Sequence, residues 1–183
     1  YMTKKRENQF YLLFCRRPFA DAYLDSAARL CRILKRSTRK SPYPGGAVIL
    51  FLAHHAVELF LKAAILQKSP DENLYSNHNI EHLEKLYHSL YSGKKYDFDV
   101  PFSKTVYLGL EPPEIPTQKT SKSALNQAYR YPVDNKGKEW HTIFAFDPVS
   151  FLPVIHQLQA DFKRLQSEIL SANTHSGVAN SHR

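Results

Sequence analysis

The sequence predicts a mainly α-helical protein, an up-and-down bundle of four to five helices with a small β-hairpin inserted before the last one. Apolar residues recur three and four positions apart over several separate stretches, which is the period of a helix packed on one face. Polar segments rich in Pro or Gly separate these stretches. We expect a basic segment over residues 1–17, a helical domain over 18–172 with the hairpin within 126–146, and a disordered tail over 173–183.

The first predicted helix covers Pro18–Lys35. Proline suits a first helical turn, where a backbone N–H has no partner within the helix. The helix presents one apolar stripe, made of Ala20, Tyr23, Leu24, Ala27, Leu30, Cys31 and Leu34. The segment Ser41–Gly46 then breaks the chain with two prolines and two glycines.

The second predicted helix, Ala47–Gln67, is the most apolar stretch of the chain. It is long enough to cross a membrane. Four polar residues interrupt it near its middle and would be costly in lipid, namely His54, His55, Glu58 and Lys62. We therefore expect the central helix of a soluble bundle and no membrane partner.

Two further helices have recognisable caps. The third begins after Asn79 or Asn77 and runs to about Tyr91. The last begins with Asp147 as the cap and Pro148 in the first turn. Its apolar positions alternate four and three apart, at Phe151, Ile155, Leu158, Phe162, Leu165 and Ile169. Between them, Ala128–Tyr131 and Trp140–Phe146 flank the turn 134–137, a pattern typical of a β-hairpin.

The positive charge of the protein is concentrated at one end of the sequence. The whole chain carries a net charge of +8, and residues 1–40, with eleven Lys or Arg and three acids, account for all of it. At the C-terminal end of the first predicted helix and just beyond it, the bases form a basic strip: Arg29, Arg32, Lys35, Arg36, Arg39 and Lys40. Such a strip can contact the phosphates of a polyanion. Alternatively, it is a solvated face whose charges suit the negative end of the helix dipole.

Composition excludes several other classes. Two cysteines, Cys15 and Cys31, cannot form a disulfide framework, and reduced thiols are typical of the cytoplasm. The apolar run Phe10–Cys15 is too short for the core of a signal peptide. We expect a cytoplasmic protein without a cofactor.

The polar group on the second helix allows two interpretations. His54 or His55 can hydrogen-bond Glu58, and Lys62 can pair with it one turn further on. The group is either a core network that fixes helix register or a cleft where pKa values are shifted and a substrate docks. A zinc site at His78–His82, which spells the inverted zincin pattern His-x-x-Glu-His, is disfavoured because no distant third ligand is identifiable.

Phe51–Leu66, with its two histidines and its Glu58-x-x-x-Lys62 core, followed after a polar loop by His78–Leu83, resembles the HEPN superfamily. The segment Ala22–Leu30 is similar to the first helix of such proteins. The resemblance implies a helical bundle, usually a homodimer, that cleaves RNA in toxin or phage-defence systems, or binds RNA or nucleotides in inactive members. The resemblance also suggests a nucleotidyltransferase-like protein as one possible partner.

The catalytic motif of that superfamily, Arg followed after four to six residues by His, is absent. The nearest pair is Arg130 and His141. We therefore expect a non-catalytic RNA- or nucleotide-binding protein, with long apolar helix faces for dimerisation. One alternative is a metal-independent ribonuclease that uses Arg130 with His141, or with helix residues such as His55, Glu58 and His78. The other is an interaction subunit that binds no nucleic acid.

Arg130 lies among aromatic residues. Tyr129, Tyr131 and Trp140 can stack on bases while Arg130 holds a phosphate. Alternatively, these rings cover the bundle and Arg130 pairs with an acid.

Overall fold

The computed structural model describes residues 4–37, 43–70, 74, 77–102, 129–130, 136 and 146–178. Over these residues it contains four α-helices and one short 3-10 helix, and no strand. The elements are α1 (Lys4–Lys35), α2 (Tyr43–Lys68), α3 (Ile80–Leu90), η1 (Lys94–Tyr96) and α5 (Pro148–Val178). The predicted mainly α-helical class is therefore confirmed.

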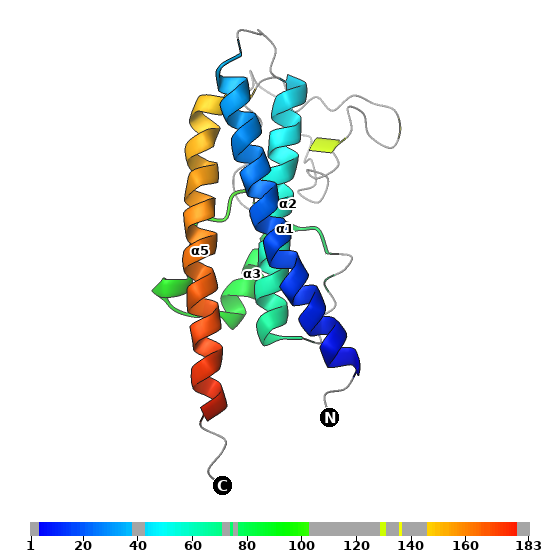
Figure 1. The fold of residues 1–183 in the computed structure, drawn as a ribbon, viewed down its shortest axis with the longest axis vertical. Helices are drawn as coiled ribbons and strands as arrows, with labels where there is room; N and C mark the ends of the chain where they lie inside the picture. The colour runs from blue at the N-terminus through cyan, green and yellow to red at the C-terminus, as the bar shows by residue number, and fades with distance from the viewer. Residues whose placement is uncertain are drawn as a thin grey trace.

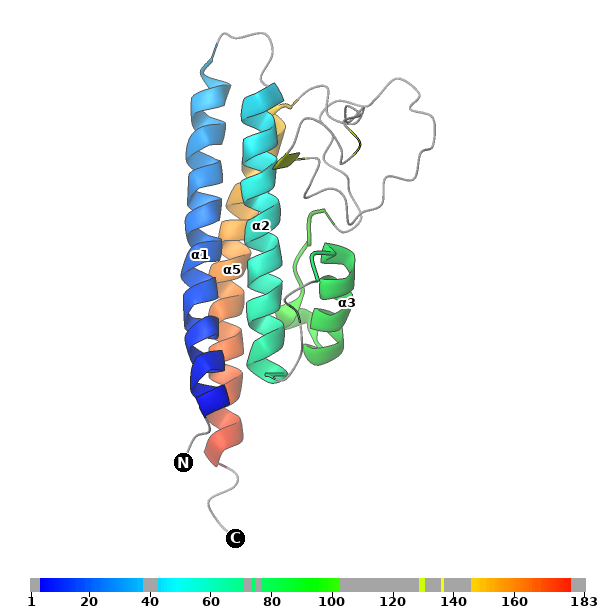
Figure 2. The ribbon, with the colours of Figure 1, turned by 90° about the vertical axis from the view of Figure 1, so that its right-hand side faces the viewer.

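The three long helices α1, α2 and α5 lie side by side along the length of the molecule (Figures 1 and 2). The ring of Tyr23 meets that of His55 at 4.9 Å, and Leu34 approaches Gly45, so α1 and α2 form an antiparallel pair. α1 is antiparallel to α5 as well, since Asp25 accepts a hydrogen bond from Gln159 at 2.6 Å and Asp21, one turn earlier on α1, accepts from Gln166 further along α5 at 3.3 Å. The C-terminal end of α1 thus lies at the same end of the bundle as the beginnings of α2 and α5.

The expected up-and-down alternation stops at α3. His78, just before α3, contacts Glu58, whereas the hydroxyl of Tyr91, just after it, donates to the carbonyl of Ala64 at 2.8 Å. α2 and α3 therefore run in the same direction (Figure 2). Simple alternation assumes that each short connection reverses the chain, whereas the contact of His78 with Glu58 places the start of α3 beside the middle of α2.

The core is built around α2. Its side chains are mostly buried, with Phe60 stacked on Phe162 of α5 at 4.0 Å and Leu61 and Ile65 fully enclosed. Among the described residues one helix, Pro44–Lys68, is long and apolar enough to cross a membrane, and 72% of its most apolar window is buried inside the protein. The helix is apolar because most of its side chains lie in the core of the bundle.

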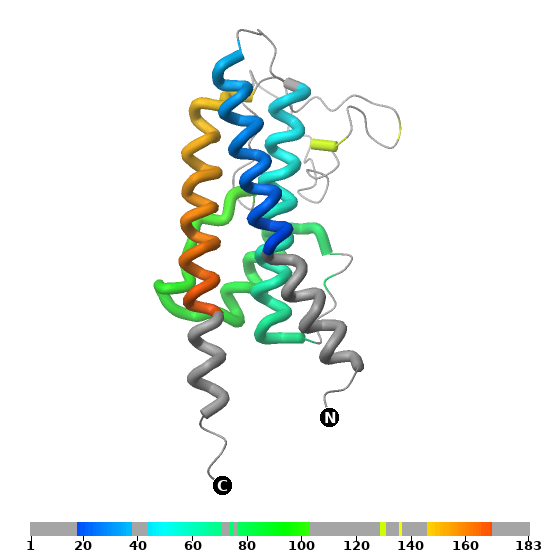
Figure 3. The backbone as a smooth tube through the Cα atoms, viewed as in Figure 1, coloured from blue at the N-terminus to red at the C-terminus, as the bar shows by residue number. Residues whose placement is uncertain are grey.

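The segment after α3 closes one side of the bundle. It crosses α5 at η1 (Figure 3), where the Arg164 guanidinium donates to the carbonyls of Lys95 and Asp97 at 2.5 and 2.7 Å. Tyr87 donates from its hydroxyl to the carbonyl of Tyr96 at 2.8 Å. These contacts satisfy backbone carbonyls that lack partners in a sheet or helix.

Two predicted caps are confirmed. Asn79 accepts a hydrogen bond from the backbone N–H of His82 at 3.3 Å, and Asp147 accepts from those of Val149 and Ser150 at 2.9 and 3.1 Å. In each case the side chain satisfies N–H groups that the first helical turn leaves without a partner.

Three predicted boundaries differ from the structure. α1 begins at Lys4, so Pro18 lies inside the helix, where it removes one backbone hydrogen bond. Residues 4–17 contain neither Gly nor Pro, so a proline alone was a poor marker of the start. α2 begins at Tyr43, within the predicted break, and α5 continues to Val178 beyond its expected end near residue 172.

The predicted β-hairpin is not supported by the described residues. Tyr129 and Arg130, which the prediction placed in its first strand, have a helical backbone. A segment as short as the four residues Ala128–Tyr131 fits a helical turn as well as a strand, so the pattern could not distinguish the two. Apart from Lys136 and Phe146, the rest of the predicted hairpin lies outside the described residues.

Gly46, in the first turns of α2, allows Phe146 to approach the helix closely. A Cβ at this position would collide with the Cβ of Phe146 and lie 2.6 Å from its Cγ. Gly46→Ala is therefore expected to lower the free energy of unfolding by about 1–3 kcal/mol, as overpacking does. Chemical denaturation measures this change.

The matched control for Gly46→Ala is Gly45→Ala, whose Cβ would lie at an ordinary 3.5 Å from Leu34. This variant is expected to stabilise the helix by up to about 1 kcal/mol. Equal effects of the two substitutions would contradict the close approach of Phe146.

Candidate functional site

The basic strip lies at the end of the bundle where α1 finishes. Arg29, Arg32 and Lys35 are on the last turns of α1 and Arg36 follows directly after it, and all four side chains are exposed. Among the described residues no carboxylate lies within ion-pair distance of any of them. Arg39, the remaining predicted phosphate contact on this strip, lies outside the described residues.

Arg32 has one contact that the sequence does not reveal. Its guanidinium lies 3.0 Å from Nε2 of His156 on α5. Since an arginine can only donate, this nitrogen of His156 must be the acceptor and carry no proton. The contact holds Arg32 beside α5 while leaving its positive charge uncompensated.

The N-terminal end of α5 does not itself offer free donors for an anion. Asp147 occupies its first N–H groups, and hydrogen bonds from Val149 and Ser150 lower the pKa of this carboxyl. Binding of an anion at this end of the bundle therefore depends on the basic side chains rather than on this helix terminus.

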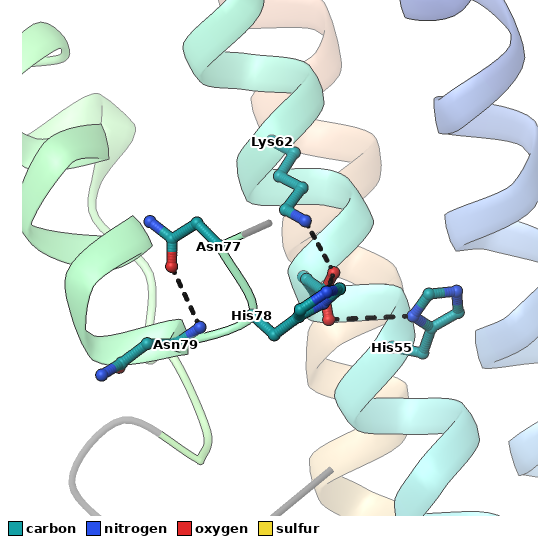
Figure 4. A network of polar contacts seen from close by, with 6 residues as sticks. His55, Lys62, Asn77, His78 and Asn79 are labelled. Carbon is teal, nitrogen blue, oxygen red and sulfur yellow. Dashed lines mark hydrogen bonds and ion pairs between the residues drawn. The ribbon is translucent and has the colours of Figure 1, made fainter. Parts of the chain in front are cut away.

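A second group of polar residues centres on the carboxylate of Glu58 (Figure 4). Its Oε1 lies 2.9 Å from Nζ of Lys62 and 3.0 Å from Nδ1 of His78, while its Oε2 lies 3.9 Å from Nδ1 of His55. The last distance is an electrostatic contact and too long for a hydrogen bond. We call Glu58 and these three partners the Glu58 cluster.

The members of the Glu58 cluster differ in their access to solvent. The side chains of Glu58 and Lys62 are 3% and 5% exposed, whereas that of His78 is 46% exposed. Burial alone would raise the pKa of Glu58, but the contacts with His55, Lys62 and His78 outweigh it and lower the pKa to about 2. The cluster is thus a buried ion pair with one histidine at its solvent edge.

His54 lies beside the Glu58 cluster in an aromatic environment. Its ring meets those of Phe102 and Tyr129 at 5.3 and 6.0 Å, and burial lowers its pKa to about 4 despite the opposing influence of Glu58. Its Nδ1 has no hydrogen-bond partner among the described residues, and neither has Oε2 of Glu58. The predicted core network is therefore only partly satisfied by the described part of the chain.

Arg130 lies next to His54 and the Glu58 cluster. Among the described residues it forms no ion pair with an acid. Its guanidinium covers the ring of Phe51 at 4.8 Å, and Phe51 also stacks on His55 at 5.8 Å. The structure thus brings together Arg130 and four of the histidine and acid candidates named above: His54, His55, Glu58 and His78. His141, Tyr131 and Trp140 lie outside the described residues.

The inverted zincin pattern does not form a metal site in the described residues. That pattern requires both histidines on one helical face, but His78 precedes the cap of α3 and contacts Glu58, so it does not share a helical face with His82. Within the described ranges no group of three or more His, Cys, Asp or Glu side chains is arranged to hold a metal ion.

Comparisons of the chain with known proteins do not identify a relative. No protein family, no curated protein and no solved structure matches the sequence.

Proposed function

We propose that this protein binds the phosphates of single-stranded RNA, or of a nucleotide, at the basic end of α1. The observation that carries the proposal is a group of four bases within the basic residues 1–40, Arg29, Arg32, Lys35 and Arg36, which stand exposed together where α1 ends. Guanidinium groups without carboxylate partners are ready to exchange counterions for phosphates. The resemblance of α2 and α3 to the HEPN superfamily supports the same class of ligand.

Charge reversal at Arg32 and Arg36 tests this proposal. Binding of a labelled single-stranded RNA, followed by fluorescence anisotropy at several salt concentrations, is expected to weaken by at least about tenfold in Arg32→Glu/Arg36→Glu. Because two phosphate contacts are lost, the slope of log affinity against log salt is expected to flatten by about 1.4, at about 0.7 per contact.

The matched control is Lys94→Glu/Lys163→Glu, which changes the net charge equally. Both lysines are exposed, and they lie in the half of the molecule where Lys95 pairs with Glu168, away from the basic end. This control is expected to retain most of the affinity and slope. Equal weakening in both double variants would show that only the net charge matters and would contradict a site at the end of α1.

One observation favours the enzyme alternative. Glu58 holds Nδ1 of His78 at 3.0 Å, so the other ring nitrogen belongs to a half-exposed imidazole with a fixed orientation. A carboxylate orients the catalytic base in many hydrolytic sites in this way. The state of the RNA after the binding assay, carried out in EDTA, distinguishes the two functions. Intact RNA supports a binding protein, whereas cleavage that Arg130→Ala abolishes would show that the protein is a ribonuclease.

A further inference from the structure

An apolar stripe lies exposed along α1. The described residues contain five exposed large hydrophobic side chains, and three of them are on this helix: Phe19, Leu30 and Ile33, exposed by 57%, 38% and 67%. At 100° per residue, these three fall within an arc of about 80° together with Ala22 and Ser26, which are also exposed. No charged residue interrupts this stripe of five residues, and such patches commonly mark interaction sites.

The α1 stripe has a symmetric pattern. Phe19 and Ile33 each lie seven residues from Ser26, and Ala22 and Leu30 each lie four residues from it. We propose that the stripe binds the same stripe of a second copy of this chain, with the two α1 helices antiparallel and Ser26 on the two-fold axis. A surface used in this way must be self-complementary.

The side chains complement one another in this arrangement. Phe19 lies against Ile33 of the partner subunit, and the small Ala22 lies against Leu30 of the partner subunit. Ser26 does not obstruct the axis, since its hydroxyl donates within its own helix to the carbonyl of Ala22 at 2.8 Å. Two helices can therefore approach closely at the centre while the larger side chains interlock on either side.

Charges beside the stripe specify the antiparallel direction. Asp25 precedes Ser26 and Arg29 follows it, and at 100° per residue both lie on the same flank of the stripe, about 100° and 60° around α1 from Ser26. With a rise of 1.5 Å per residue, Arg29 lies about 4.5 Å beyond the axis, within about 3 Å of the height of the partner's Asp25. The described partner of Asp25 is the neutral Gln159, which leaves its charge uncompensated. A parallel pair in register would instead place like charges together.

This proposal does not depend on phosphate binding, because none of the five residues of the stripe belongs to the basic strip; Arg29 is the one residue that both proposals use, and no variant below changes it. Its first test is the oligomeric state by sedimentation. The wild-type protein is expected to be a dimer at micromolar concentration. Ile33→Glu is expected to raise the dissociation constant roughly a hundredfold, because one substitution places two charges in a symmetric interface. Circular dichroism establishes that the variant retains its helices.

The matched control is Val149→Glu, which introduces the same charge at an exposed valine of α5 (54%) outside the stripe. This variant is expected to remain a dimer. A wild-type protein that is monomeric, or a Val149→Glu variant that dissociates as readily as Ile33→Glu, would overturn the proposal.

Cross-linking tests the direction of the helices. In a Cys15→Ser background, Ser26→Cys is expected to give a disulfide-linked dimer under mild oxidation. Ala22→Cys is expected not to, because the two Ala22 positions lie about 12 Å apart along an antiparallel pair, beyond the reach of a disulfide. Efficient cross-linking through position 22, or none through position 26, would overturn the antiparallel arrangement.

Discussion

Replacing Glu58 with glutamine is expected to lower the free energy of unfolding by about 3–5 kcal/mol. The Lys62 ammonium would then lose its carboxylate at 2.9 Å in a site where its side chain is only 5% exposed, and an unbalanced buried charge is costly. Glutamine preserves the shape of the side chain, so the loss reports the charge rather than a cavity. Urea denaturation at pH 7 measures it, with unchanged m-values establishing that both proteins unfold in the same way.

The matched control is Glu81→Gln, because Glu81 pairs with Lys85 at the same spacing and at 3.1 Å, but with side chains that are 35% and 72% exposed. Exposed pairs contribute little, so this substitution is expected to cost less than about 1 kcal/mol. The double variant Glu58→Leu/Lys62→Met removes both buried charges and is expected to recover most of the stability lost in Glu58→Gln. A loss in Glu58→Gln no larger than in Glu81→Gln would contradict a buried, charged Lys62.

The sequence predicted those parts of the fold that depend on neighbouring residues. The cap at Asn79 acts on His82 and the cap at Asp147 acts on Ser150, and each lies within three residues of its partner. The direction of α3 was not predictable in this way. It depends on contacts such as that of His78 with Glu58, twenty residues earlier, which no periodicity records.

In the candidate site, too, contacts between residues close in sequence were predictable and contacts between distant segments were not. The ion pair of Glu58 and Lys62 follows from their spacing on one helix. The contact of Arg32 with His156 joins residues 124 positions apart, and Arg130 reaches Phe51 from a segment far along the chain. Sequence could nominate Arg32 and Arg130 by their charge, but their partners depend on packing between helices. The same holds for the α1 stripe, since spacing alone does not distinguish a buried apolar face from an exposed one.

Acid is expected to destabilise the protein in two separable steps, of which His54 controls the first. Burial lowers its pKa from the usual 6.5 to about 4 in the folded state, so between these values the unfolded chain binds one more proton. Stability is therefore complete above about pH 6.5 and falls as the pH drops toward 4, by about 3 kcal/mol in total. Glu58, whose pKa is lowered to about 2, contributes its own loss only below its usual value of 4.5.

Substituting His54 with phenylalanine is expected to abolish the first step while retaining the second, since the ring can still pack on Phe102. Denaturation curves from pH 7 to about pH 2 measure both steps. Tyr129→Phe is the control, because it alters a neighbour of His54 but leaves the imidazole in place; it is expected to shift the whole profile without changing its slope. If His54→Phe lost stability between pH 6.5 and 4 as steeply as the wild type, some other group would have to bind the proton. If His54→Phe removes this loss, the buried imidazole of His54 limits the stability of the bundle in mild acid, because the aromatic packing that encloses it opposes its protonation in the folded state.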